Sequence, residues 1–125
     1  MLSGQCFCGA VTFTATAAPI GVISCHCTDC QQMHGTYNAM AGVPRNGLTI
    51  IGPVTWYNSS DKARRGFCGT FGSRMFKDNH GSDRMMISMG AVAGSTGLRN
   101  FKNIFTGSHG DWYDLPPEEP PRFSA

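Results

Sequence analysis

Cysteines are the residues of this sequence with the clearest capacity for chemistry, and they occur in groups. The 125 residues include six of them: Cys6, Cys8, Cys25, Cys27, Cys30 and Cys68. Alternate residues of an extended strand share one face, so the sulfurs of Cys6 and Cys8 can point at the same ion. Gly9 follows this pair and permits a tight turn of the backbone around such an ion. The spacing therefore indicates metal binding.

The densest group, Cys25-His26-Cys27-Thr28-Asp29-Cys30, combines the same spacing with a C-x-x-C pattern. This arrangement brings three sulfurs to about 2.3 Å from one Zn²⁺ without help from elsewhere in the chain. Three thiolates leave one position of a tetrahedron free, which is typical of catalytic rather than structural zinc sites. We therefore expect an external ligand to enter this position.

Disulfide bonds are the main alternative use of an even number of cysteines. They require an oxidising compartment, and the first residues, Met1 to Cys6, carry neither the basic nor the apolar segment of a secretory signal. We therefore expect a cytoplasmic protein whose thiols stay reduced. Bridges within a C-x-C pair are also strained, while Cys68 taken alone is typical of a small buried hydrophobic residue. Metal binding is favoured over disulfides.

Composition and charge exclude several classes of protein. Hydrophobic residues make up 41% of the sequence, which is too many for a disordered chain, and the apolar runs are too short to cross a bilayer. The net charge is +2 and the pI is about 8.3, whereas the pI of a nucleic-acid-binding domain is typically above about 9. Lys62, Arg64 and Arg65 form the only basic cluster, which we interpret as the solvated edge of a strand. His26 and His34 are interpreted as ordinary loop histidines, with hydrogen bonding to a substrate as the alternative.

Short strands separated by turns are the expected elements. Helical periodicity is nearly absent, and β-branched, aromatic and methionine residues gather in short segments bounded by Gly, Pro, Asn or Asp. The predicted strands are Ala10–Thr16, Val22–Cys27, Tyr37–Val43, Leu48–Ile51, Val54–Tyr57, Arg74–Lys77 and Met85–Met89. Short helices are predicted at Asp29–Met33 and Leu98–Phe105, and residues 115–125 form an extended, proline-rich tail. The sequence thus predicts one mainly β domain over residues 1–125.

The segments that carry the cysteines are specific enough to compare with known families. They are Gly4-Gln5-Cys6-Phe7-Cys8-Gly9-Ala10-Val11, Cys25-His26-Cys27-Thr28-Asp29-Cys30 and Phe67-Cys68-Gly69-Thr70-Phe71-Gly72. They resemble the glutathione-dependent formaldehyde-activating enzyme family, which also includes centromere protein V of animals. A weaker similarity runs from Asn103 to Trp112, so the resemblance covers essentially the whole chain. It implies a small zinc-binding β-tent of stacked antiparallel sheets.

The resemblance also implies two zinc sites. The structural site carries over to Cys6, Cys8 and Cys68. The catalytic site, associated with glutathione, carries over to Cys25, Cys27 and Cys30. The sequence departs from the family at Phe71, where the family has a fourth cysteine. The first site is then left with three thiolates: water or a histidine such as His80 could complete it, or it binds zinc weakly or remains empty.

The function that the resemblance implies is that of a carbon–sulfur lyase, which joins glutathione and formaldehyde reversibly to S-hydroxymethylglutathione. The expected partner is a small thiol such as glutathione, not a membrane or a nucleic acid. The alternative, suggested by the centromere relative, is a non-catalytic zinc module that binds a protein or nucleic-acid partner. The mild charge disfavours nucleic acid, as does the lack of interleaved aromatic and basic residues.

Overall fold

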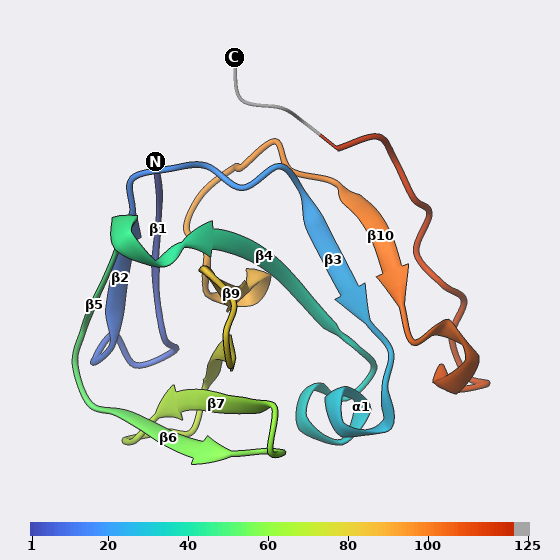
Figure 1. Cartoon of the computed structure of the whole chain (residues 1–125), viewed down its shortest axis with the longest axis horizontal. Coiled ribbons are helices and arrows are strands. Elements are labelled where there is room, and N and C mark those ends of the chain that lie inside the picture. Colours follow the sequence, from blue (N-terminus) through green and yellow to red (C-terminus); the bar gives the residue numbers. More distant parts are fainter. Residues whose placement is uncertain (122–125) are drawn as a thin grey trace.

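The computed structural model describes residues 1–121, which fold into two β-sheets and one short helix (Figure 1). The elements are β1 (Leu2–Gln5), β2 (Thr12–Ala15), β3 (Val22–Cys25), α1 (Thr28–His34), β4 (Asn38–Pro44), β5 (Leu48–Ile51), β6 (Val54–Asn58), β7 (Ala63–Cys68), β8 (Arg74–Asn79), β9 (Arg84–Ser88) and β10 (Asn100–Ile104), with 3₁₀ turns η1 (Arg45–Gly47), η2 (Met89–Ala91) and η3 (Thr106–Ser108). The smaller sheet has the order β1-β2-β5, and the larger has the order β10-β3-β4-β9-β8-β7-β6. The prediction of a mainly β fold with antiparallel sheets is confirmed, with one parallel pair, β10 beside β3.

The seven predicted strands all overlap strands of the structure, and β1, β7 and β10 are further strands that the sequence did not reveal. The predicted helix at Asp29–Met33 lies within α1. The predicted helix at Leu98–Phe105 is wrong, because this segment contains β10. Its apolar residues recur at helical spacing, but the side chains of Asn100 and Asn103 hydrogen-bond to β3, to His26 and to the C-terminal segment. These tertiary contacts override a weak helical preference.

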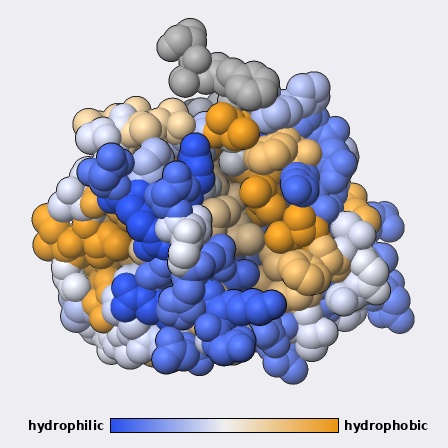
Figure 2. Space-filling model, in the orientation of Figure 1, coloured by the Kyte–Doolittle hydropathy of each residue, from blue (hydrophilic) through white to orange (hydrophobic). Residues whose placement is uncertain are grey.

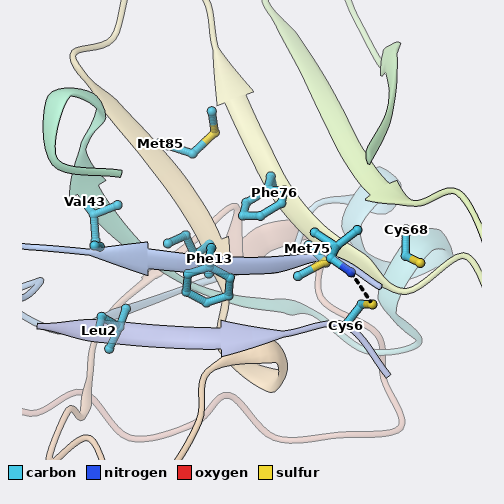
Figure 3. Close-up of a cluster of buried hydrophobic side chains, with 11 residues drawn as sticks. Leu2, Cys6, Phe13, Val43, Cys68, Met75, Phe76 and Met85 are labelled. Carbon is cyan, nitrogen blue, oxygen red and sulfur yellow. Dashed lines mark hydrogen bonds between the residues drawn. The ribbon is translucent and has the colours of Figure 1, made fainter. Parts of the chain in front are cut away.

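The main core lies between the two sheets. Phe13 of β2 and Phe76 of β8 meet edge to face, with ring centroids 5.9 Å apart, and Met75 and Ile87 are fully buried beside them. Figure 3 shows that Cys6 and Cys68 lie at the edge of the same cluster, where the Cys6 sulfur accepts a hydrogen bond. One group of cysteines is therefore anchored directly to the core.

A second, smaller cluster lies on the opposite face of the seven-stranded sheet. Along β9, Ile87 packs in the main core while its neighbour Met86 packs against the cluster of Cys25, Cys30 and Met40. Neighbouring residues of a strand point to opposite faces, so the second group of cysteines and α1 lie on the face away from the smaller sheet. Figure 1 shows α1 beside the ends of β3 and β4, far from β1 and β2.

The surface mixes polar and apolar regions. In Figure 2, apolar side chains gather over β5, where Ile51 is exposed, and over the region of β3. Near β3 a cavity of about 250 Å³ is lined by Ile20, Ile23, Met86 and Phe101. No helix among residues 1–121 is long and apolar enough to cross a membrane.

The C-terminal segment runs back along β10 in Figure 1. The side-chain amides of Asn100 and Asn103 donate to the carbonyls of Pro117 and Pro116 at 3.1 and 2.9 Å. The segment from Leu115 onwards has no helix or strand as far as residue 121, and the predicted tail at 122–125 lies outside the described residues. Trp112 is 62% exposed.

Candidate metal centres

The six cysteines are free thiols and form two groups of three. Cys6, Cys8 and Cys68 make one group, and Cys25, Cys27 and Cys30 make the other. Within each group all three sulfurs lie within 4.8 Å of one another, so each could hold a metal ion. The structure brings Cys68 to the C-x-C pair, as the resemblance implied.

The group of Cys25, Cys27 and Cys30 is built by the turn from β3 into α1. Cys25 ends β3, and Cys27 caps α1, its sulfur accepting a hydrogen bond from the Cys30 backbone N–H at 3.3 Å. The side-chain amide of Gln31 donates to the carbonyls of His26 and Ser108 at 2.8 and 2.6 Å, which fixes this turn against η3. Cys25 and Cys30 are fully buried and Cys27 is half-buried. The group therefore opens to solvent on the side of Cys27.

Arg65 is the residue near this group that the sequence analysis placed wrongly. It is 5% exposed rather than solvated, and both terminal nitrogens of its guanidinium donate to the Cys30 sulfur at 3.6 Å, while Nε donates to Ser59 Oγ at 3.3 Å. Its neighbour Arg64 points to the other face, over the Trp56 ring at 4.1 Å. Neighbouring residues of a strand point to opposite faces, so two adjacent arginines cannot both face solvent when one face of the strand is covered.

A buried guanidinium is costly unless an anion compensates its charge. Among the described residues, the ion pairs of the structure are Arg45–Asp78, Arg64–Asp78 and Arg99–Glu119, and none involves Arg65. Arg65 donates hydrogen bonds to Cys30 and Ser59, and of these two side chains Cys30 is the one that can supply an anion, by losing its proton. The Arg65 guanidinium therefore favours the thiolate form of Cys30.

The two buried thiols of this group lie close enough to affect one another's acidity. The interaction with the Cys30 thiol lowers the pKa of Cys25. The interaction with the Cys25 thiol, together with burial, raises the pKa of Cys30, against the opposing effect of the Arg65 guanidinium. Cys25 is thus the first of the pair to lose its proton, and a cation in the group would displace the remaining one.

His26 does not join the sulfurs, although it lies between two of them in sequence. It is fully buried on the other side of the turn, with Nδ1 3.0 Å from the Tyr113 hydroxyl and Nε2 2.9 Å from Asn103 Oδ1. Its ring also packs against Tyr37 and Tyr113. His26 is therefore a structural link between the cysteine turn and the C-terminal segment.

A cavity of about 500 Å³ lies beside Cys6 and is also lined by His34, at the end of α1. Cys6, Phe7, His34, Tyr37, Ser73 and Arg74 are among the residues that line it. His34 lies one helical turn after Cys30 on the same face of α1. Burial, with the nearby charges of Arg65 and Arg74, lowers the pKa of His34 to about 4, so its imidazole is neutral at physiological pH. The cavity thus offers one cation and several neutral hydrogen-bonding groups.

The group of Cys6, Cys8 and Cys68 joins the turn after β1 to the end of β7. The sulfurs of Cys6 and Cys8 are 3.5 Å apart, and those of Cys8 and Cys68 are 3.6 Å apart. Gly9 has φ +80°, as expected for the tight turn that follows the pair. Hydrogen bonds from the backbone N–H groups of Phe71 and Thr70 outweigh burial and lower the pKa of Cys68 to about 6.

His80 is too distant to complete this group. Ala63 pairs with Asn79 at one end of the β7-β8 hairpin, and Phe67 pairs with Arg74 at the other, next to Cys68. His80 follows Asn79, so the length of β7, about 17 Å, separates it from Cys68. Phe71, three residues after Cys68, is 69% exposed and meets Phe7 edge to face at 6.5 Å.

Both groups fit a zinc ion by the chemistry of their donors. Tetrahedral zinc with sulfur ligands at about 2.3 Å places those sulfurs about 3.8 Å apart. The separations of 3.5 and 3.6 Å in the group of Cys6, Cys8 and Cys68 are close to this value. Each group supplies three soft donors, which suits zinc better than a hard cation.

Comparison with known proteins agrees with this geometry. The model of a family described as glutathione-dependent formaldehyde-activating enzyme matches residues 1–108. Among solved structures, a crystal structure of a Rhodobacter sphaeroides protein superposes with a TM-score of 0.60 at 20% identity, covering 78% of this chain and 97% of that chain. At this identity the similarity shows a shared fold. No curated protein matches the sequence.

Proposed function

Because this chain belongs to the glutathione-dependent formaldehyde-activating enzyme family, we propose that it is a zinc-dependent carbon–sulfur lyase acting on a small thiol adduct of the S-hydroxymethylglutathione type. In the joining direction, the thiol sulfur forms a bond to the carbonyl carbon, and the proton lost by the thiol ends on the former carbonyl oxygen. The lyase direction breaks the same carbon–sulfur bond and returns the proton to sulfur. The reaction needs no oxidant or reductant.

Cys25, Cys27 and Cys30 are the residues that we propose as the ligands of the catalytic zinc. When bound, the ion would lower the pKa of an incoming thiol and orient it. The observation that carries the proposal is the buried Arg65 guanidinium on Cys30, beside a group that opens at Cys27. A single positive charge there offsets the net negative charge of zinc with three thiolates. Because the Arg65 charge cancels the net charge of zinc with three thiolates, the site could accept one more anionic ligand.

The cavity lined by Cys6, His34 and Arg74 supports a peptide-like thiol as substrate. Its volume of about 500 Å³ falls within the range of small-ligand sites. Arg74 supplies a cation for a carboxylate. The neutral imidazole of His34 can accept a hydrogen bond from a substrate hydroxyl or amide. These side chains bind and orient, and the carbon–sulfur chemistry is assigned to the cysteine group.

The proposal places the protein in the cytoplasm, where small thiols are abundant and cysteines stay reduced. The six free cysteines support this placement, because they form two compact groups and no disulfide. The same reducing conditions keep a substrate thiol available.

Replacing Cys27 tests the proposal. We expect zinc-loaded Cys27→Ser to lose at least about tenfold of the rate at which the wild type forms or cleaves the adduct of glutathione and formaldehyde, followed by NMR above the uncatalysed background. Thr28→Ser, at an exposed neighbouring position, is the matched control and should keep the wild-type rate. Equal rates in Cys27→Ser and wild type would remove this group from the chemistry and favour a non-catalytic zinc module.

A further inference from the structure

The group of Cys6, Cys8 and Cys68 offers three sulfurs where zinc prefers four ligands. Among residues 1–121, no other His, Cys, Asp or Glu completes the group, and His80 lies at the far end of the hairpin. The Cys6–Cys8 and Cys8–Cys68 sulfur separations of 3.5 and 3.6 Å, with all three sulfurs within 4.8 Å of one another, are compatible with three corners of a tetrahedron around zinc. The fourth corner has no donor from the described part of the chain.

The loop after Cys68 explains why the chain does not fill this corner. The Gly72 N–H donates to the Cys68 carbonyl at 2.8 Å, and the Cys68 N–H donates to the Ser73 carbonyl at 2.9 Å, which closes a tight turn. Phe71 lies in this turn with its ring directed to solvent. The backbone therefore has the compact form of a metal-binding loop, but the side chain at residue 71 cannot ligate.

The surroundings of the group are open and aromatic. Cys6 and Phe7 line the cavity of about 500 Å³, and Cys8 is half-exposed. Phe7, 87% exposed, pairs with Phe71 to form an aromatic rim beside the sulfurs. The Phe7 N–H donates to Ser73 Oγ at 3.2 Å and so joins the two loops that carry the rim. A ligand that reaches the sulfurs passes this rim.

We propose that Cys6, Cys8 and Cys68 form a second open zinc site, whose fourth ligand is an external thiolate carrying an aromatic or other apolar group. A thiolate restores the four-sulfur coordination that closed zinc sites use. The rings of Phe7 and Phe71 provide contacts that an aromatic substituent can make and a small polar thiol cannot. This site is separate from Cys25, Cys27 and Cys30 and does not depend on catalysis there.

Cobalt substitution of the wild type and Phe71→Cys tests the proposal, because thiolate-to-cobalt absorbance reports sulfur coordination. We expect wild type to bind two Co²⁺ ions. Benzyl mercaptan should raise the thiolate-to-cobalt absorbance of the wild type, which has two open sites, about twice as much as that of Phe71→Cys, in which one site is closed. Phe71→Ala keeps the site open without the rim. Its preference for benzyl mercaptan over 2-mercaptoethanol should fall about fivefold relative to wild type.

Several results would overturn the proposal. One is binding of a single Co²⁺ by the wild type with two by Phe71→Cys, and another is an equal thiol response in both proteins. X-ray absorption of the zinc-loaded wild type gives a check that needs no variant, since all-sulfur coordination without added thiol would also contradict an open site. Failure of the lyase assignment gives a different result. If Cys25, Cys27 and Cys30 bound no thiol, the absorbance response to thiol would persist in the wild type, through Cys6, Cys8 and Cys68, and vanish in Phe71→Cys, where that site is closed.

Discussion

Arg65 shows how much of the candidate catalytic site depends on a single side chain. Its guanidinium donates two hydrogen bonds to Cys30 in a buried setting, where a charged hydrogen bond is stronger than in water. The bond favours the thiolate and offsets the negative charge that three thiolates place around a divalent ion. In the proposed zinc site, Arg65 would act on the metal through Cys30, as a positioning residue.

Replacing Arg65 should weaken metal binding without weakening the fold to the same degree. We expect Arg65→Met to bind zinc about ten- to a hundredfold less tightly than wild type in competition with a chromophoric chelator, and Arg65→Lys to recover part of the loss. The metal-free forms should be similarly stable in urea, because Met removes a buried charge. Wild-type zinc affinity in Arg65→Met would contradict this role.

The origin of this interaction also explains why it was not predicted. The sequence Arg64-Arg65 resembles a solvated basic patch, and only the tertiary contact of β7 with Cys30 of α1 shows that one of the two arginines is interior. The triplet of Cys25, Cys27 and Cys30 was predictable because its geometry is local. The meeting of Cys68 with Cys6 and Cys8 is not local, and it was anticipated through the family resemblance.

At the scale of elements, Asp78 holds together the hairpin that carries Cys68. The carboxylate of Asp78, on β8, accepts hydrogen bonds from Arg64 of β7, at 2.8 Å, and from Arg45 of η1. Burial works to raise the pKa of Asp78, but the two arginines outweigh it and leave the pKa lowered. The ionised carboxylate therefore stabilises the folded state.

Removing this charge should produce a pH-dependent loss of stability. We expect Asp78→Asn to lose about 2 kcal/mol of unfolding free energy at pH 7 in urea denaturation. A lowered folded-state pKa gives stability that is complete above the unfolded pKa of about 3.9 and is lost as the pH falls through the folded value. The difference from wild type should therefore shrink below about pH 4. Asp61→Asn, at an exposed turn, is the control, and a constant difference across this range would contradict the role of Asp78.

β10 shows where strand prediction failed at the same scale. In isolation, the apolar residues Leu98, Phe101, Ile104 and Phe105 follow a helical spacing. The structure instead pairs the segment with β3 in parallel, an arrangement that needs a partner distant in sequence. The other strands were mostly predictable because the turns that flank them contain Gly, Pro and Asn. Parallel pairing has no comparable local signal.

At the scale of the whole molecule, the two cysteine groups connect parts of the fold in different ways. Cys25, Cys27 and Cys30 lie within a single turn, whereas Cys6 and Cys8 follow the smaller sheet and Cys68 ends a strand of the larger one. An ion bound by Cys6, Cys8 and Cys68 would link the two sheets across the end of the core. Its effect on the free energy of unfolding should therefore be larger than that of an ion bound by Cys25, Cys27 and Cys30.

Chelation measures this difference. Zinc-loaded wild type should be stabilised over the chelator-treated protein by about 4 kcal/mol for each bound ion, at a thousandfold excess of zinc over the dissociation constant of each site. Cys68→Ser should lose more of this zinc-dependent stabilisation than Cys27→Ser, as measured by thermal unfolding with and without zinc. If Cys27→Ser lost more, the linkage between the sheets would not be the main source of stability.

The position of Phe71 has a consequence for the history of the site. Its ring is exposed at a turn and touches little beyond Phe7, so the fold places almost no constraint on the side chain there. A phenylalanine codon becomes a cysteine codon by one nucleotide substitution, and the reverse is equally short. A lineage can therefore exchange a sealed centre for an accessible one in one mutational step, with the scaffold unchanged.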